Sequence, residues 1–596
     1  MTDVTYDNLV QLYTTSVERF GDNPLFGERD DAGTWDWMTY ARFGETVDQA
    51  RAGLAALGVG SGDRVAIISD NRTQWAVGAY ATYGLGAAWV PMYEAQQPKD
   101  WYFILDDSGA KVAFVANDTI RAALEDQAAE LGDLEHIVVI DGDAGGDAIT
   151  YDDLLAKGAE APADAVQSEG DHLAGLIYTS GTTGKPKGVM LSHGNIASNI
   201  NALNQVFPLD PEDRSASFLP WAHSFGQTVE LHALVSFGSS TGMTSAKTLT
   251  RDLPEIQPTL LVAVPTVFNK VYDGLQKMME AKGGVTQAIF NKAIANARKR
   301  SDLAKRGKKT RWVEMQHGLY DKAVFSKVRD GLGGNLKYAF SGGAAISTEV
   351  AEFISAVGIT VYEGYGLTET SPVVTANVRG ARKVGSVGQA IPGVEVKIDS
   401  DVSPEEGIGE IVVYGPNVLQ GYYNLPDENA KVFTEDGGFR TGDLGFIDEE
   451  GFLFIRGRIK EQYKLENGKY VVPSPIEEQI NLSGFVESNM VHGEQRPYNV
   501  ALIVPDSEAV TAWATEQGLD TSDYGSLLDS DEIHTLISSE LDRTQEPVKH
   551  YERVRDFVLA GDEWTPENGM LTPSLKVKRR AVMEKYGEQI DALYPE

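Results

Sequence analysis

Short runs of apolar residues alternate with segments of helical periodicity from about residue 45 to 380. The clearest apolar runs are Arg64–Ser69, Lys111–Val115, His136–Ile140, Leu260–Val264 and Leu336–Ser341. Continuous apolar runs between helical segments are typical of strands that are buried on both faces of a mostly parallel sheet. The pattern therefore predicts an α/β fold for this part of the chain.

The pattern changes near residue 384. Between about residues 384 and 456 the chain alternates short strands with glycine-rich links, which predicts a small β-barrel or an open sheet. The strands expected there are Val394–Ile398, Gly409–Tyr414 and Phe452–Ile455. Helix-like and strand-like pieces then mix as far as Glu596. We expect a large N-terminal domain of residues 1–458, which includes the β-rich part, and a small, mobile α+β domain of residues 459–596.

One stretch, Trp75–Tyr93, runs for 19 residues without a charge. It is rich in Ala, Gly and Tyr and contains Pro91, whereas a membrane-spanning helix needs about 20 strongly apolar residues. We interpret it as a buried helix from Thr73 to about Tyr83, a glycine turn, and a strand at Ala87–Met92.

Composition narrows the functional classes. The 596 residues are 42% hydrophobic and 23% charged, which is typical of a globular protein, and the net charge is −35 at pH 7. Such an acidic chain repels phosphate backbones, so we expect no nucleic-acid partner. The absence of cysteine excludes disulfides, a thiolate nucleophile and Cys-ligated metals, and it fits a reducing compartment. The N-terminus shows no signal peptide pattern, so we expect a cytoplasmic protein.

One segment departs from the overall charge. Residues 298–329 contain eleven basic and three acidic residues, whereas the rest of the chain is strongly acidic. The segment is either a solvated helical face or a contact for anionic lipid headgroups or ligand phosphates. The sequence leaves these alternatives open, and with them a peripheral attachment to membranes.

The strongest chemical signal is YTSGTTGKPKGVMLSHGN at Tyr178–Asn195. Glycines let backbone N–H groups converge on an anion, and hydroxyls and lysines add further donors. The segment is not a P-loop, because Pro186 follows Lys185 where that motif has Ser or Thr. It predicts a loop that binds a triphosphate or pyrophosphate.

Five further segments follow in the order typical of the adenylate-forming superfamily, which contains acyl-CoA synthetases, luciferases and the adenylation domains of nonribosomal peptide synthetases. The chain resembles this superfamily over nearly its whole length. The segments are SGGA at Ser341–Ala344, YEGYGLTET at Tyr362–Thr370, TGDL at Thr441–Leu444, GRIKEQYK at Gly457–Lys464 and LTPSLK at Leu571–Lys576. The resemblance implies two steps: a carboxylate attacks the α-phosphate of ATP, and a thiol then attacks the acyl-adenylate.

The resemblance also implies where ATP binds. The β- and γ-phosphates would be held by Thr179, Ser180, Gly181, Thr182, Thr183, Gly184 and Lys187. The strip that encloses adenine would be Gly342, Gly343, Ala344, Glu363, Gly364, Tyr365 and Gly366. Asp443 and Arg458 would contact the ribose, although Asp443 by itself also suits a plain turn.

The catalytic residues follow from the same resemblance. Glu369 is expected to bind Mg²⁺, Thr368 to donate to the α-phosphate, and Lys576 to bridge the carboxylate and that phosphate. Leu575 stands where many relatives have glycine. Lys460 resembles the hinge of the small domain, or is a plain surface charge, and Lys464 and Gly468 would serve the second step. His223, in LPWAHSFGQ, would gate the acyl tunnel or position the reacting carboxylate, or it is a structural histidine.

LPWAHSF, GKYVVP, LTPSLKVKR and the helical insert at Val271–Arg329 resemble long-chain fatty acyl-CoA synthetases of the bacterial type. The expected substrates are thus a long-chain fatty acid, ATP and CoA. Alternatives are a medium-chain or aryl acid ligase, a fatty acyl-AMP ligase that loads a carrier protein, a luciferase-like oxygenase, and an inactive binding homologue. The chain shows no obvious insertion between Val394 and Ile455 of the kind found in the carrier-loading enzymes, which favours CoA.

Overall fold

A computed structural model of the chain describes residues 4–30, 32–127, 130–180, 185–305, 307–343, 346–402, 407–572 and 575–595. The chain divides into two compact units. Unit 1 comprises Met1–Lys397, Val412–Arg440 and Glu449–Leu453. Unit 2 comprises Ile398–Ile411, Thr441–Asp448 and Phe454–Glu596.

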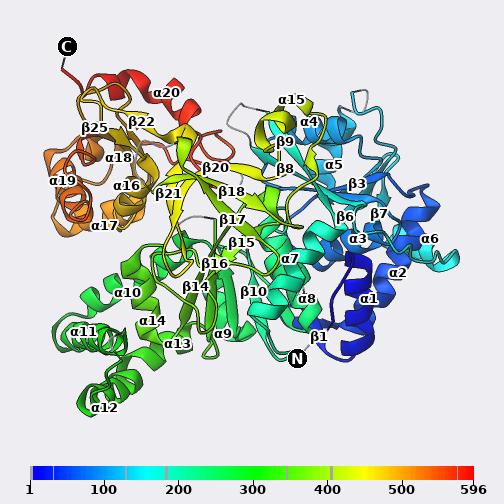
Figure 1. Cartoon of the computed structure of the whole chain (residues 1–596), viewed down its shortest axis with the longest axis horizontal. Coiled ribbons are helices and arrows are strands. Elements are labelled where there is room, and N and C mark those ends of the chain that lie inside the picture. Colours follow the sequence, from blue (N-terminus) through cyan, green and yellow to red (C-terminus); the bar gives the residue numbers. More distant parts are fainter. Residues whose placement is uncertain are drawn as a thin grey trace. The chain divides into compact units, whose positions relative to one another are not determined.

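Unit 1 contains two large sheets (Figure 1). The order of the nine-stranded sheet is β16-β15-β14-β13-β12-β10-β11-β1-β2, and that of the eight-stranded sheet is β19-β9-β8-β4-β3-β5-β6-β7. The inner strands pair in parallel, and β2, β15, β16, β9 and β19 join antiparallel. The predicted α/β fold with mostly parallel sheets is therefore confirmed.

The strands of the nine-stranded sheet are β1 (Pro24–Arg29), β2 (Trp35–Thr39), β10 (Arg214–Ser217), β11 (Ser240–Met243), β12 (Leu260–Ala263), β13 (Tyr338–Ser341), β14 (Thr360–Gly366), β15 (Val373–Ala376) and β16 (Gln389–Ala390). Those of the eight-stranded sheet are β3 (Arg64–Ile68), β4 (Ala88–Met92), β5 (Val112–Asn117), β6 (His136–Asp141), β7 (Ile149–Thr150), β8 (Leu173–Ser180), β9 (Pro186–Ser192) and β19 (Gly421–Tyr422).

The helices of unit 1 are α1 (Leu9–Phe20), α2 (Tyr40–Ala56), α3 (Thr73–Tyr83), α4 (Pro98–Ser108), α5 (Asp118–Glu125), α6 (Tyr151–Glu160), α7 (His193–Val206), the π-helix η1 (Gly226–His232), α8 (Ala233–Phe237), α9 (Leu249–Ile256), α10 (Pro265–Lys282), α11 (Gly284–Lys305), α12 (Arg311–Tyr320), the π-helix η2 (Asp321–Phe325), α13 (Ser326–Gly331), α14 (Thr348–Val357), the 3-10 helix η3 (Thr368–Thr370) and α15 (Pro426–Val432).

The uncharged stretch near residue 80 folds as expected. It forms the buried helix α3 and the strand β4, whose five residues are all buried. No helix among the described residues has the length and hydropathy that a membrane span requires. Trp75 of α3 packs edge-on against Trp89 and Trp221, at ring centroid distances of 5.4 and 5.6 Å, in the largest core cluster of the unit.

The β-rich segment forms a four-stranded sheet in the order β17-β18-β20-β21, the open-sheet form of the two that the sequence allowed. The chain passes between the two units within this segment. Its elements are β17 (Glu395–Asp399), the 3-10 helix η4 (Ser400–Val402), β18 (Gly409–Tyr414), β20 (Phe439–Ile447) and β21 (Leu453–Arg458).

The remainder of unit 2 is an α+β structure around one three-stranded sheet, β24-β25-β26. Alternate residues of β25 pack on opposite sides: Ala501 and Ile503 contact the cluster of α16, α17 and α19, whereas Val500 and Leu502 contact that of α20. The elements are the 3-10 helix η5 (Ile459–Glu461), β22 (Tyr463–Lys464), β23 (Tyr470–Val471), α16 (Pro473–Ile480), β24 (Val486–His492), β25 (Asn499–Pro505), α17 (Ser507–Glu516), α18 (Tyr524–Leu528), α19 (Asp531–Thr544), β26 (Val554–Leu559) and α20 (Arg579–Asp591).

Candidate active site

The predicted phosphate loop joins β8 and β9, which pair antiparallel with Thr179 opposite Lys187. Residues 181–184 and 344 lie outside the described residues. After β9, Ser192 begins helix α7: its hydroxyl accepts from the N–H of Asn195, whose side chain accepts from the N–H of Ser192. The hairpin therefore fixes the positions of Thr179 and Ser180, just before the loop, and of Lys187, just after it.

Lys187 contacts two residues from a distant part of the sequence. Its Nζ forms a 2.6 Å ion pair with Glu428 of α15 and lies 5.3 Å from the ring centroid of Tyr422. Hydrogen bonds and charge from Lys187 and Lys431 lower the pKa of Glu428 to about 2. Glu428 is therefore ionised at neutral pH and positions the lysine.

Tyr422 links this lysine to Glu369 of η3. The tyrosine hydroxyl donates to Glu369 Oε1 at 2.8 Å, and the Leu419 N–H donates to the Glu369 carbonyl oxygen at 2.9 Å. Two predicted site residues, Glu369 and Lys187, thus contact the same tyrosine. The sequence offered no signal for Tyr422 or Glu428, since both lie far along the chain from the residues they contact.

Thr368 contacts the segment that carries His223. Its hydroxyl shares a buried 3.1 Å hydrogen bond with the hydroxyl of Ser224. The Nδ1 atom of His223 accepts a hydrogen bond from the N–H of Phe225 at 3.2 Å. The ring proton of the neutral imidazole is therefore on Nε2, which can donate. His223 is partly exposed.

The predicted adenine strip consists of closely packed backbone at the ends of β13 and β14. A Cβ on Gly342 would meet the ring of Phe225 at 3.0 Å, and one on Gly366 would meet the Pro372 carbonyl oxygen at 1.8 Å. Neither position can therefore carry a side chain without movement. Glu363 is 7% exposed, and burial raises the pKa of its carboxyl to about 7.

A second buried carboxyl, that of Glu230, was not predicted from the sequence. Glu230, in η1, accepts hydrogen bonds from the hydroxyls of Ser215 and Ser217 and from the indole N–H of Trp221. Burial raises the pKa of Glu230 to about 7, against the lowering effect of those three donors. It ties β10 and η1 to the segment Trp221–Phe225.

In unit 2, the predicted ribose contacts meet. Arg458 Nε lies 2.9 Å from Asp443 Oδ1, and Asp443 is 5% exposed. Gly442 adopts a φ of +73°, and its N–H donates to Glu410. The TGDL segment therefore lies within strand β20 rather than in a plain turn, and its buried aspartate pairs with an arginine.

The remaining predicted residues of unit 2 lie on exposed turns. Lys460 is in η5 just after Gly457, whose φ is +137°. Lys464 is in β22, which pairs with β23 through a turn containing Gly468 at φ +85°. A short antiparallel strand pair therefore carries Lys464, and the roles of Lys460, Lys464 and Gly468 stay predictions.

Lys576 comes directly before Val577, which forms a bridge with Leu571. Its N–H donates to the hydroxyl of Thr572, and its carbonyl accepts from the N–H of Thr572. Leu575 adopts a φ of +60°, a left-handed conformation that costs a non-glycine residue about 1–2 kcal/mol. This explains in physical terms why glycine suits the position that precedes the lysine.

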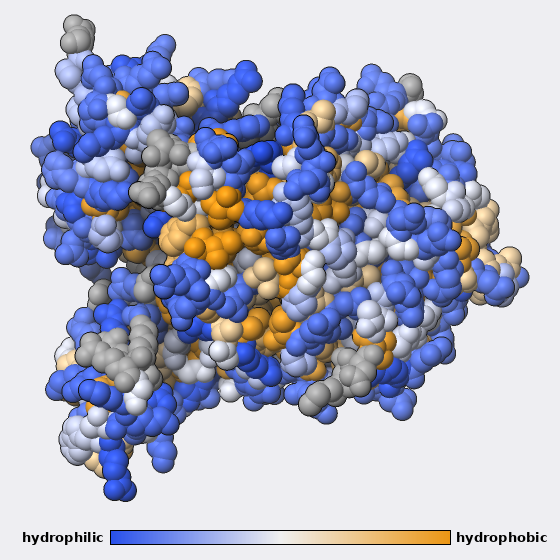
Figure 2. Space-filling model, in the orientation of Figure 1, coloured by the Kyte–Doolittle hydropathy of each residue, from blue (hydrophilic) through white to orange (hydrophobic). Residues whose placement is uncertain are grey.

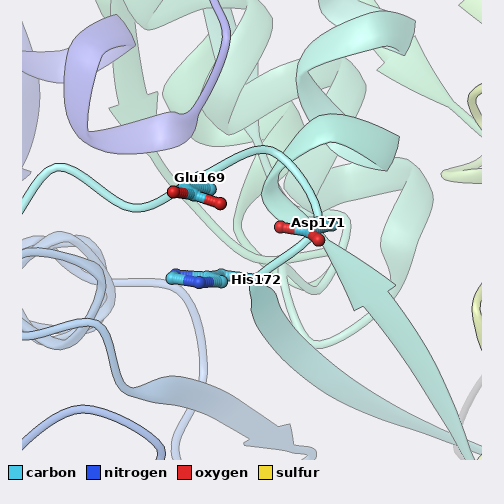
Figure 3. A group of neighbouring side chains, drawn as sticks. All are labelled: Glu169, Asp171 and His172. Carbon is cyan, nitrogen blue, oxygen red and sulfur yellow. The ribbon is translucent and has the colours of Figure 1, made fainter.

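Another group of potential metal ligands lies on the loop before β8. Ligand atoms of Glu169, Asp171 and His172 lie within 4.8 Å of one another (Figure 3). All three residues are exposed and come from one four-residue stretch. Exposed carboxylates commonly gather without a metal, so this group gives no functional assignment.

The chain matches two known protein families. "AMP-binding enzyme" matches residues 13–423, and "AMP-binding enzyme C-terminal domain" matches residues 460–596. The chain belongs to the AMP-binding enzyme family. It is accordingly an adenylate-forming ligase that joins an acid to a thiol, and it binds ATP and AMP.

Members of the family with similar sequences include fatty acid ligases. The chain is 34% identical over 570 residues to the long-chain-fatty-acid–CoA ligase FadD15 of Mycobacterium bovis, covering 94% of this chain and 93% of that protein. It is 30% identical over 620 residues to the peroxisomal long chain acyl-CoA synthetase 7 of Arabidopsis thaliana, covering 99% and 86%. The adenylation domain of a carboxylate reductase from Mycobacterium chelonae shares the fold, with a TM-score of 0.81 at 24% identity over 98% of this chain and 91% of that one.

Proposed function

We propose that this adenylate-forming enzyme is a long-chain fatty acid–CoA ligase. A fatty acid carboxylate oxygen attacks the α-phosphorus of ATP, the bond to the bridging oxygen breaks, and pyrophosphate leaves with the electron pair. The sulfur of CoA, having lost its proton, then attacks the acyl carbonyl, and AMP leaves. The relatives named as long-chain ligases support this substrate class.

An apolar pocket in unit 1 is the observation that carries the proposal. It has a cavity volume of about 70 Å³ and lies between one face of β12 to β15 and the helices α7, η1 and α8. Leu260 and Val262 of β12, Phe340 of β13 and Tyr362 of β14 line the sheet side. Each methylene group buried against such a lining contributes roughly 0.8 kcal/mol to binding, which favours an alkyl chain over a polar group.

The pocket is oriented along the strands. Ser341, Glu363 and Gly364 line it at the carboxyl ends of β13 and β14, directly beside the predicted adenine strip. Toward the opposite ends, Phe207 packs against Tyr338, Phe340 and Tyr362 at ring centroid distances of 4.7 to 5.6 Å. An acyl chain would thus lie with its carboxylate toward the nucleotide and its methyl end toward Phe207.

In unit 1, the residues suit a magnesium–ATP complex. A single hard carboxylate, Glu369, oriented by the Tyr422 hydroxyl, is the kind of ligand that Mg²⁺ takes beside phosphate oxygens. The bound ion would neutralise phosphate charge in the first step. The loop from Thr179 to Gly184 would hold the β- and γ-phosphates with Lys187, and Thr368 would donate to the α-phosphate.

In unit 2, Asp443 and Arg458 would contact the ribose, and Lys576 would place its ammonium group between the attacking carboxylate and the α-phosphate. Residues 459–596 would rotate about Lys460 after adenylation, so that Lys464 and Gly468 serve the attack by CoA. Lys576 is then needed for the first step alone.

The test is a panel of saturated acids from C2 to C20, with benzoate, assayed for pyrophosphate release with CoA, with a phosphopantetheinyl carrier protein and with neither. We expect acids of about C12 and longer to react at least tenfold faster than acetate or benzoate, with sustained turnover only when CoA is present. Preference for a short or aryl acid would contradict the proposed substrate. Turnover with the carrier protein but not with CoA would contradict the proposed acceptor.

A further inference from the structure

Polar residues cover most of the face of the molecule shown in Figure 2, so exposed large apolar side chains are notable. Ten such residues are exposed in the part of the chain that the structure describes, and half of them lie in just two helices, α11 and α12. These five residues are Val285, Ile289, Trp312, Met315 and Leu319. Helix α11 packs against α10 and α14, and α12 packs against α11 and η2, at one end of unit 1 (Figure 1).

Helix α12 presents its apolar residues on one side. Trp312, Met315 and Leu319 are 61%, 54% and 65% exposed, and their spacing of three and four residues places them on one face. The helix packs through another face, where Val313 is 2% exposed and Glu314 pairs with Arg300 of α11. The stripe of Trp312, Met315 and Leu319 therefore contacts solvent.

Positive charge borders this stripe. Lys308, Lys309 and Arg311 come just before it and Lys322 just after it, all of them exposed. The two acidic residues of the same stretch are engaged elsewhere, Glu314 with Arg300 and Asp321 with Arg329. The four cations form no ion pair with any residue that the structure describes. Their charge stands out in a chain whose net charge is −35.

We propose that α12 and these four cations form a docking surface for an anionic lipid bilayer. An exposed apolar stripe flanked by Lys and Arg is typical of helices that lie in the membrane interface. Each basic residue near an anionic surface raises partitioning roughly fivefold, and the acidic remainder of the chain is repelled, so this surface orients the protein. A nucleic acid would use the cations and leave the stripe in water.

Cosedimentation of the full-length protein with vesicles tests the proposal. We expect binding to phosphatidylcholine vesicles that contain about 30% phosphatidylglycerol, and at least tenfold weaker binding to pure phosphatidylcholine. Raising the salt from about 0.05 M to about 0.5 M should also weaken binding, because the attraction is screened. Absence of binding to the anionic vesicles, or equal binding to both kinds, would overturn the proposal.

Two triple variants separate the contributions. W312S/M315S/L319S removes the stripe, and K308Q/K309Q/R311Q removes charge; each is expected to weaken binding to anionic vesicles at least tenfold. The control K99Q/K157Q/K247Q removes three exposed cations elsewhere in unit 1 and should bind as the wild type does. Circular dichroism confirms folding.

Equal binding by the stripe variant and the wild type would overturn the proposal. So would wild-type self-association in sedimentation velocity that the stripe variant abolishes, since the stripe would then be an interface between copies of this chain.

Discussion

Three candidate site residues of unit 1 and two lysines of unit 2 differ in how the fold holds them. In unit 1, Lys187, Glu369 and Thr368 each bond a side chain from a distant part of the sequence. In unit 2, Lys460 and Lys576 are exposed, and the backbone of Lys576 bonds to Thr572, only four residues earlier in the sequence.

This difference fits the different roles that we propose for these residues in the two reaction steps. Residues that hold a substrate through both steps gain from being positioned beforehand, because the cost of ordering them is already met on folding. A residue needed in one step only must be able to leave, and an exposed position suits such a movement.

Replacing the exposed lysine should have the largest effect. Lys576→Ala is expected to lower acyl-adenylate formation by roughly 10²–10³, the usual cost of one well-placed donor in a charged transition state. ATP–pyrophosphate exchange with a long-chain acid measures it. Arg580→Ala, which removes an exposed arginine four residues on, is the control and should keep near-normal exchange.

The buried carboxyl of unit 1 should make stability depend on pH. The pKa of Glu230 is about 7 in the fold and about 4.5 when unfolded, so the unfolded chain loses this proton first as pH rises. This group therefore lowers the free energy of unfolding by about 2–3 kcal/mol between pH 5 and pH 8.

Glu230→Gln should lack that decrease, whereas the exposed control Glu212→Gln should show it fully. Unfolding by denaturant at both pH values measures the difference between each variant and the wild type. Parallel pH dependence in Glu230→Gln and the wild type would contradict the buried carboxyl, and with it the preset geometry of unit 1.

Replacing the proposed magnesium ligand should have the next largest effect. Glu369→Gln keeps the hydrogen bond from Tyr422 possible but removes the charge, so about tenfold more Mg²⁺ should be needed for half-maximal adenylation. Tyr422→Phe, which keeps the carboxylate and loses its orienting hydroxyl, should shift the magnesium titration less. An unaltered titration in Glu369→Gln would remove this assignment.

The smallest effect is expected in the apolar pocket. Phe207→Ala should shift preference toward longer acids, with each additional methylene improving relative kcat/KM up to about fourfold. Phe207→Leu should shift it in the same direction with less loss of packing. Phe433→Ala, a half-buried phenylalanine outside the pocket, is the control; an unchanged chain-length profile in both Phe207 variants would show that Phe207 does not limit the acyl chain.

The sequence predicted the elements of unit 1 well because strands buried on both faces must be apolar throughout. Arg64–Ser69 and His136–Ile140 are examples, and the structure places β3 and β6 there within a residue or so. The order of the strands within the sheets could not be predicted from the sequence. That β1 and β2 join the nine-stranded sheet through β11 depends on contacts more than 200 residues apart, which no local pattern records.

The candidate site also contains residues that the sequence predicted and others that it did not. The segments that carry Glu369, Asp443 and Lys576 were found because their residue types and order are distinctive. Their partners were not: Tyr422 and Ser224 are ordinary residues whose importance comes from what they touch. Glu230 was missed because a buried glutamate differs from an exposed one only in its surroundings. Leu575 was noticed as unusual, and its positive φ gives the reason.

The central claim is that Lys576 acts in one step only. The most direct test supplies purified long-chain acyl-AMP and CoA to Lys576→Ala and measures the rate of thioester formation against wild type. The account predicts nearly equal rates, although the same preparation adenylates the acid at least a hundredfold more slowly. An equally large loss in both steps would contradict it.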